Sequence, residues 1–152
     1  MSEPAVSKQT VHSVAVVITD ATGRLLVVKR DDEDKDLPGV WGLPAATIRD
    51  GETPEQAAIR AAADKLGVSV RIGRFTGEDT IDHRHLREYE AEIVDGTPSV
   101  PQNDPSVSQY ADLKYTDEPR ILVEAARKGS LCSRIYLRNA GINAGIAFKR
   151  RP

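Results

Sequence analysis

The sequence predicts a mixed α/β (α+β) fold in which a mixed sheet lies between helices. Two β-rich segments each precede a helical segment, an order typical of a sheet packed against helices. The chain has 152 residues, of which 39% are hydrophobic and 29% are charged. That length and composition fit one domain with one core and leave no room for a second full domain. We therefore expect residues 1–152 to form a single domain.

The first β-rich segment is "VHSVAVVITD", an apolar, β-branched run that begins at Val11. The turn "ATGR" and a second apolar run, "LLVVKR", follow it. The pattern predicts a hairpin of two well-buried strands at the centre of the sheet. The next segment, "DDEDKDLPGVWGLPA", contains an acidic run and two prolines. It is expected to form an irregular surface connection that makes one wall of a pocket.

Residues 54–66 predict a helix, because nearly all of them are good helix formers. Thr53 is placed to cap the helix, and Pro54 stands at the first helical position, where its missing N–H costs nothing. Gly67 then provides the residue with positive φ that commonly ends a helix. The helix is therefore expected to begin and end at defined residues.

The second half of the chain predicts further strands at 68–81 and 86–96, a short strand at 110–115, and two helices at 118–130 and 131–141. In the strand that contains "EYEAE" the glutamates alternate with other residues, so we expect them to form its solvated face. The loop "DHRH" at 82–85 offers a second place for chemistry. Its histidines are expected to be surface residues rather than metal ligands.

Composition excludes several classes of protein. The net charge of −2 gives no long-range attraction to nucleic acid or anionic lipid, and no run approaches the roughly 18 apolar residues of a membrane span. The N-terminus lacks the features of a secretory leader, so we expect the protein in the cytoplasm. The single cysteine, Cys132, excludes an internal disulfide and a cysteine-based zinc cluster, and is expected to be a small core residue.

The spacing of "AATIRDGETPEQAAIRAAADKLGV" carries a more specific signal. Five residues separate Ala46 from Glu52, seven more separate Glu52 from Arg60, and Gly67 and Val68 close the segment. With the preceding "VWGLP", this resembles the Nudix box of hydrolases that cleave nucleoside diphosphates linked to another group. The resemblance covers roughly residues 11–138 and implies a Nudix-like α/β/α sandwich.

The chain departs from the family pattern where the family binds metal. In the family, three glutamates on one helical turn and a glycine carbonyl hold magnesium or manganese. The corresponding residues here are Ala61, Asp64, Lys65 and, for the carbonyl, Ala45. The resemblance implies Asp64 and the Ala45 carbonyl as metal ligands and Asp64 and Lys65 as catalytic residues. Because lysine places a positive charge where a dication would sit, we expect the ion to be held weakly or only together with substrate.

The parts of the motif that do not bind metal are retained. The resemblance implies that Glu52 and Arg60 form a structural pair between loop and helix, and that Gly67 closes the motif. Loop residues 36–41 and either Arg84 or Arg87 are candidates for contacts with the base or phosphates of the ligand, and Lys65 would neutralise phosphate. Trp41 is either a stacking platform or a core residue, and the core reading is favoured.

Two functions therefore remain open from the sequence. The first is a divergent Nudix-type hydrolase of a phosphoanhydride in a small nucleotide-like ligand, with an altered metal site. The second is a catalytically impaired Nudix-fold protein that binds or senses such a ligand. Isomerase chemistry is a third and lesser alternative, since one fold hosts many reactions. Acids and histidines between Glu78 and His85 could rebuild a metal site, and exposed strands would allow a homodimer.

Overall fold

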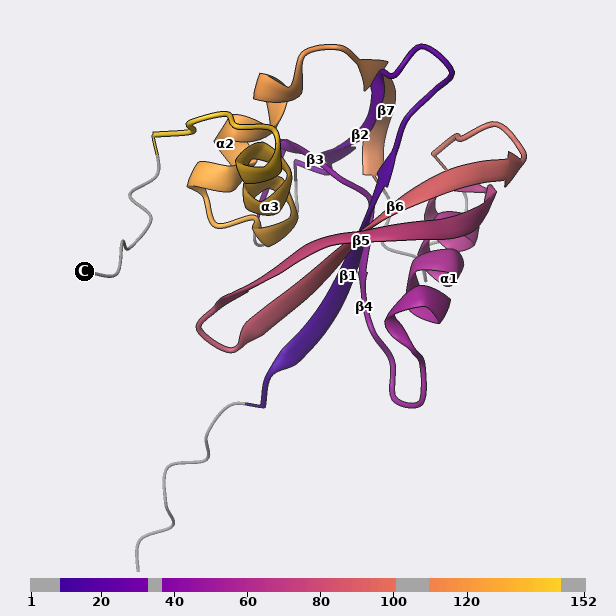
Figure 1. Ribbon diagram of the computed structural model, residues 1–152, viewed down its shortest axis with the longest axis horizontal. Helices are drawn as coiled ribbons and strands as arrows, with labels where there is room; N and C mark the ends of the chain where they lie inside the picture. The colour runs from indigo at the N-terminus through magenta and orange to yellow at the C-terminus, as the bar shows by residue number, and fades with distance from the viewer. Residues whose placement is uncertain (1–8, 33–36, 101–109, 146–152) are drawn as a thin grey trace, which may run out of the picture.

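A computed structural model describes residues 9–32, 37–100 and 110–145 of the chain (Figure 1). Its regular elements are, in chain order, β1 (Val11–Ile18), β2 (Leu25–Arg30), β3 (Trp41–Gly42), β4 (Ala45–Thr47), α1 (Pro54–Leu66), β5 (Ser69–Ile81), β6 (Arg84–Asp95), β7 (Tyr110–Thr116), the 3-10 helix η1 (Pro119–Leu122), α2 (Val123–Arg127) and α3 (Leu131–Asn139). Asp36, the first of the loop residues expected to contact the ligand, lies outside the described residues.

The strands form a four-stranded mixed sheet in the order β4-β1-β6-β5 and a three-stranded sheet in the order β3-β2-β7. The expected hairpin of β1 and β2 is wrong, because the two strands belong to different sheets. Parallel pairing with β6 runs from Val11 to Ile18, and β4 occupies the other side of β1 at Ser13–Ala15. Over these central residues both hydrogen-bonding edges of β1 are occupied. Only the bridge between Thr19 and Leu25 links β1 to β2.

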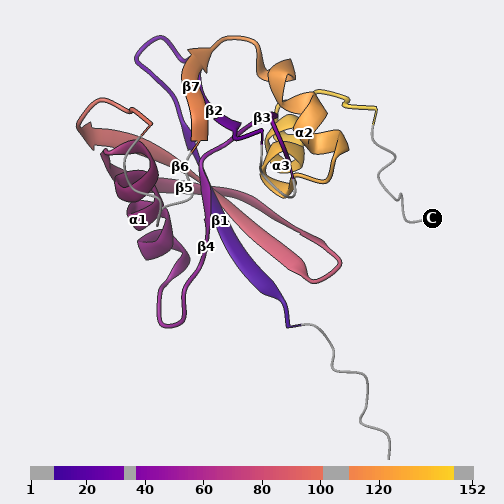
Figure 2. The same ribbon diagram turned by 180° about the vertical axis from the view of Figure 1, so that it is seen from behind.

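Helices α1 and α3 cover opposite faces of the four-stranded sheet (Figures 1 and 2). Successive residues of β1 point to opposite faces. Val14, Val16 and Ile18 therefore join the core beneath α1, and Ala15 and Val17 join the core beneath α3. This arrangement confirms the predicted sandwich of a mixed sheet between helices.

The local signals predicted α1 correctly at both ends. The Thr53 side chain accepts a hydrogen bond from the Gln56 N–H, and the Gln56 side chain bonds back to the Thr53 N–H. Gly67 ends the helix with φ of 69°. The buried face of the helix carries small residues together with one large one, Leu66. Alanines on this face allow the helix to lie close to the sheet.

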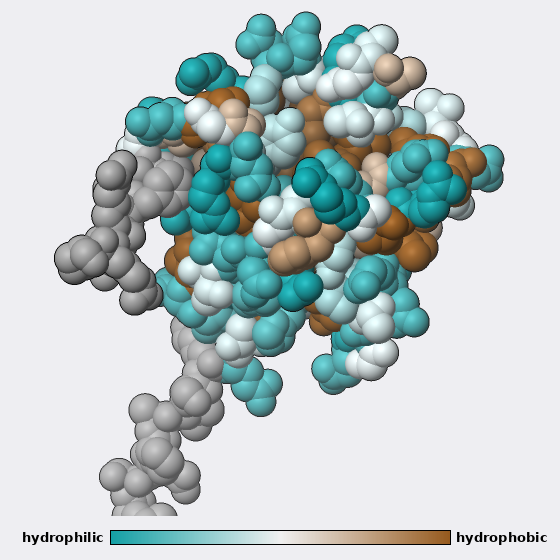
Figure 3. All heavy atoms as spheres, in the orientation of Figure 1, coloured by the Kyte–Doolittle hydropathy of each residue, from teal (hydrophilic) through white to brown (hydrophobic). Residues whose placement is uncertain are grey.

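The remaining predicted elements follow in the expected order, with one helix divided. The short strands β3 and β4 were not predicted, and β3 lies in the segment expected to be irregular; each forms because its backbone pairs with a longer strand, β3 with β2 and β4 with β1. The segment expected as a helix over 118–130 forms η1 and then α2, and Gly129 ends it with φ of 99°. No helix among the described residues has the length and hydrophobicity to span a membrane. Polar side chains cover most of the face that carries the β5–β6 hairpin (Figure 3).

Candidate functional site

A cavity of about 370 Å³ opens at the edge of the four-stranded sheet, beside β4. The α3-facing side chains of β1 and β6 contribute to it, together with the start of α3 and residues that reach it from α1 and β7. Its described lining residues are Val11, Ser13, Arg30, Leu37, Ala45, Ala46, Thr47, Lys65, Arg84, His85, Leu86, Tyr110, Ser130, Leu131 and Cys132. Because Ala45 and Lys65 both line it, this is the cavity that contains the altered motif.

Lys65 directs its ammonium group at the edge strand. Its Nζ donates a hydrogen bond of 2.6 Å to the carbonyl oxygen of Ala45, the oxygen that the family resemblance assigned to a metal. The Tyr110 ring lies beneath the same ammonium, 5.5 Å from Nζ to the ring centroid. The Tyr110 hydroxyl is also within hydrogen-bonding distance of both the N–H and the carbonyl of Ala45, at 3.2 and 3.3 Å. A cation supplied by the chain therefore lies at the wall of the cavity.

The expected pair of Glu52 and Arg60 is present and partly buried. Two guanidinium nitrogens of Arg60 donate to the two carboxylate oxygens of Glu52 at 2.8 and 3.0 Å, and both side chains are about one-fifth exposed. Arg60 also donates to the carbonyl of Thr47 at the end of β4. The Arg60 hydrogen bond and one from the Arg49 N–H lower the pKa of Glu52 to about 2. The pair therefore ties α1 to the loop that precedes it and to the edge strand.

The structure separates the three expected ligand-binding residues. Arg84 lines the cavity and donates to the carbonyl of Gly129 at 3.4 Å. Arg87 lies on the α1-facing side of β6, where its guanidinium is 4.4 Å from the centroid of the Phe75 ring. Trp41 is partly buried on β3, with the Lys114 ammonium 4.8 Å from its ring centroid, and is not among the lining residues. Of the three, only Arg84 is placed to contact a ligand in this cavity.

The helix residues do not fit the divalent ion that the family resemblance implies. Asp64 is exposed to solvent, Ala61 is buried without a donor atom, and the Lys65 ammonium occupies the carbonyl of Ala45. Within residues 9–32, 37–100 and 110–145, no group of three or more His, Cys, Asp and Glu side chains could hold a metal ion. Magnesium bound by protein requires carboxylate or carbonyl oxygens, so a single exposed aspartate is a poor site.

Sequence reasoning missed a buried acid behind the cavity. Glu88, expected on the solvated face of β6, is fully buried, because α3 covers this part of the sheet. Its Oε1 accepts a hydrogen bond from Thr76 at 3.2 Å, and its Oε2 has no hydrogen-bond partner among the described residues. Burial raises the pKa of Glu88 to about 8. The expectation that Cys132 is a buried core residue is confirmed, and burial also raises the pKa of its thiol.

A larger cavity of about 800 Å³ lies at the opposite end of the strands. Several of its charged lining residues pair with other charged residues, as Arg71 does with Glu92 at 3.0 Å and Asp20 with Arg24 at 2.8 Å. These pairs compensate their own charges, whereas the described lining of the smaller cavity includes Arg30, Lys65 and Arg84 and no carboxylate. The smaller cavity is therefore the better candidate for an anionic ligand.

Comparison with known families assigns the fold. The sequence model of the NUDIX domain matches residues 9–128 of the chain. The chain belongs to this family. Nudix hydrolases generally use divalent metal ions. The departure of the helix from the metal-binding pattern is therefore a departure within the family, in which the chain keeps the Glu52–Arg60 pair and Gly67 of the Nudix motif.

Relatives of known sequence include two bacterial proteins. The chain is 31% identical to the 8-oxo-dGTP diphosphatase of Proteus vulgaris over 83 residues, which cover 52% of this chain and 71% of the relative. It is 32% identical to a putative 8-oxo-dGTP diphosphatase of Bacillus subtilis (strain 168) over 75 residues, 47% of each protein. The match to the second therefore spans less than half of that relative.

Solved structures share the Nudix fold at low sequence identity. A NUDIX hydrolase from Nitrosomonas europaea aligns with a TM-score of 0.67 and 16% identity, over 88% of this chain and 89% of the other. The MutT protein from Methanosarcina mazei Go1 aligns with a TM-score of 0.62 and 13% identity, over 90% of this chain and 97% of the other. At these identities the likeness describes the fold alone.

Proposed function

We propose that the chain binds the phosphoanhydride of a small nucleotide-like ligand in the cavity beside β4, with Lys65 supplying positive charge in place of the family's helix-bound ion. The contact between the Lys65 ammonium and the Ala45 carbonyl carries this proposal. Lys65 is also one of the residues that line the cavity, so its positive charge lies at the cavity wall. Arg30 and Arg84 add two further cationic side chains to the same lining. Three cationic side chains around a partly enclosed cavity favour a ligand with several negative charges.

Binding without efficient turnover is the form of this function that the site favours. Hydrolysis of a phosphoanhydride needs charge stabilisation and also an activated water. Lys65 and Arg84 offer the first, but the helix positions that would hold a water-activating ion carry alanine, an exposed aspartate and lysine. A lysine ammonium is a donor without acceptor capacity, so it cannot take a proton from water while charged.

Hydrolysis remains the second candidate function. It is supported by family membership and by the similarity to proteins named as diphosphatases. In this form the chain would cleave a phosphoanhydride with the metal site altered, and magnesium or manganese would enter with the substrate's own phosphates. Such ions commonly bind through one or two carboxylates together with substrate phosphates, and Asp64 would be the protein's contribution.

Calorimetric titration with ADP, ATP and 8-oxo-dGTP, each with EDTA and with magnesium, tests the binding proposal. The test variant is Lys65→Met, which keeps the approximate length of the side chain but removes its charge. The matched control is Lys128→Met, which removes a lysine that pairs with Glu124 of α2. We expect binding in EDTA by the wild type and by Lys128→Met. Lys65→Met should bind roughly tenfold or more weakly, since a hydrogen bond to a charged group is worth about 1.5–3 kcal/mol. Equal binding by both variants would contradict the role of Lys65.

Phosphate and pyrophosphate release from the same nucleotides separates the two candidate functions. Wild-type protein that binds a nucleotide but releases nothing with magnesium or manganese acts as a binding protein. Release that depends on the metal and disappears in Asp64→Ala identifies the chain as a hydrolase with an altered metal site. If the wild type bound none of the nucleotides tested, the proposed function itself would be overturned.

A further inference from the structure

Two histidines from distant parts of the chain meet on the α1-facing side of the sheet. His12 of β1 and His85 of β6 are register partners in the parallel pair, so their side chains leave the same face at the same level. Their Nδ1 atoms lie 3.3 Å apart, and the rings meet edge to face with centroids 5.4 Å apart. His85 is also one of the residues that line the cavity, whereas Val11, Ser13, Arg84 and Leu86 line it from the opposite, α3-facing side of the sheet.

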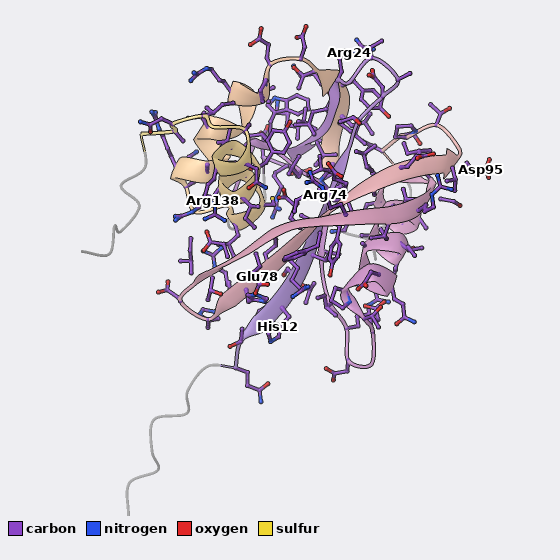
Figure 4. The ribbon with its side chains drawn as sticks, in the orientation of Figure 1. His12, Arg24, Arg74, Glu78, Asp95 and Arg138 are labelled. Atoms are coloured by element: carbon purple, nitrogen blue, oxygen red, sulfur yellow. The ribbon has the colours of Figure 1, made fainter. Side chains whose placement is uncertain are left out.

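A carboxylate on the next strand fixes the orientation of one ring. Nε2 of His85 lies 2.9 Å from Oε1 of Glu78 on β5, and the other carboxylate oxygen of Glu78 lies 3.3 Å from the guanidinium of Arg87. A carboxylate only accepts hydrogen bonds, so Nε2 of His85 carries the proton. In a neutral ring the lone pair is then on Nδ1, which faces His12. Figure 4 shows His12 and Glu78 near the end of the β5–β6 hairpin that carries the connecting turn.

This arrangement is the one that metal-ligating histidines adopt in proteins. Such a histidine generally donates its second ring N–H to a carboxylate, which sets the tautomer and increases the basicity of the ligating nitrogen. With metal–nitrogen bonds of about 2.1 Å, two nitrogens 3.3 Å apart subtend an angle of about 105° at the ion, close to the tetrahedral value. The spacing of the two Nδ1 atoms therefore matches a shared ion as well as it matches a shared proton.

We propose that His12 and His85 chelate a divalent transition-metal ion through their Nδ1 atoms, with Glu78 as the hydrogen-bond partner that orients His85. Two imidazoles favour zinc, nickel or copper over magnesium and calcium, which take oxygen ligands. The exposed position of His12 leaves the outer side of the ion open to water, which completes the coordination. Because the ligands come from β1 and β6, the ion would join these two strands next to the cavity that His85 also lines.

The site is tested with untagged full-length protein titrated with nickel and zinc chloride in a calorimeter. We expect one ion per chain for the wild type, and loss of that binding in His12→Gln and in His85→Gln. Glu78→Gln should keep both ligands but bind roughly 10- to 100-fold more weakly, the usual effect of removing a carboxylate partner of a metal-bound histidine. His83→Gln is the matched control, because His83 is the third histidine of the chain and lies in the adjacent turn.

Two-dimensional NMR of the wild type keeps the test independent of whether the variants fold. Paramagnetic nickel should broaden the ring signals of two of the three histidines and spare those of His83. Binding that survives both His12→Gln and His85→Gln, binding that His83→Gln removes, or uniform broadening of all three rings would overturn the proposal. A wild type that binds neither nickel nor zinc would show that the pair shares only a proton.

Discussion

Replacement of Glu88 by glutamine should remove a large part of the pH dependence of the chain's stability. Glu88 is fully buried on the α3-facing side of β6. The Thr76 hydroxyl on β5 donates a hydrogen bond to one carboxyl oxygen of Glu88. On α3, the guanidinium of Arg138 lowers the pKa of Glu88, and the charge of Glu88 in turn helps to raise the pKa of Cys132 and Tyr136. Burial outweighs the effects of Thr76 and Arg138, so the carboxyl is protonated in the folded protein at neutral pH. Glutamine has nearly the same shape and cannot ionise.

The size and sign of the effect follow from the two pKa values. Unfolding returns the pKa from about 8 to its ordinary value of 4.5. Between these values the folded state holds one more proton than the unfolded state, so the free energy of unfolding falls as pH rises. Its contribution is fully present below pH 4.5 and is lost by about pH 8. At roughly 1.4 kcal/mol per pH unit, the whole interval corresponds to about 5 kcal/mol. Local opening beneath α3 would admit water and reduce this figure, which is therefore an upper limit.

Urea unfolding at a series of pH values measures this contribution. The difference in the free energy of unfolding between wild type and Glu88→Gln should change steadily between pH 5 and pH 8. The variant should be the more stable protein at the alkaline end. Glu90→Gln is the control, because Glu90 is exposed on the same strand and pairs only at the surface with Arg74. Parallel curves for wild type and Glu88→Gln would refute the assignment of Glu88 as a buried, protonated acid.

Three further predictions concern the Nudix motif and its surroundings. Arg60→Ala should lower the melting temperature by roughly 2–5 °C, because it leaves the partly buried Glu52 carboxylate unpaired; an unchanged value in calorimetry would argue against a structural role for the pair. Wild type should bind magnesium weakly or not at all without a phosphate ligand, whereas Lys65→Glu combined with Ala61→Glu should bind it measurably in a calorimetric titration. Tight magnesium binding by the wild type would contradict the reasoning. Trp41 fluorescence should be blue-shifted and change little on nucleotide addition, and a large quench would place the ring at the ligand.

The sequence predicted those parts of the fold that depend on neighbouring residues. Helix α1 was correct at both ends, because Thr53 and Gly67 act on the backbone within a few positions of themselves. The pairing of β1 was not predictable in the same way, because its partner β6 lies far along the chain. An apolar run shows that a strand is buried but does not say which strand lies beside it. The strands β1 and β2 lie in different sheets because β1 pairs with strands distant in the sequence.

The candidate site shows the same division. The motif spacing predicted the Glu52–Arg60 pair, because the family pattern fixes both positions. Alternation along β6 placed its glutamates on one face, but it could not show that α3 covers Glu88 and leaves Glu90 and Glu92 exposed. The meeting of His12 with His85 likewise depends on the register of two strands distant in sequence. Local sequence patterns therefore could not predict these contacts, which form between segments distant in the sequence.

The spacing of positions 61 and 65 determines whether α1 could gain a metal site through one substitution at a time. The two positions are one helical turn apart, so their side chains project in nearly the same direction. A glutamate introduced at position 61 alone would meet the Lys65 ammonium and form an ion pair within the helix. A glutamate introduced at position 65 alone would remove the ammonium from Ala45 and stand beside Asp64 without a third carboxylate. Each single step thus yields an incomplete metal site, and selection for metal binding would gain fully only from both changes together.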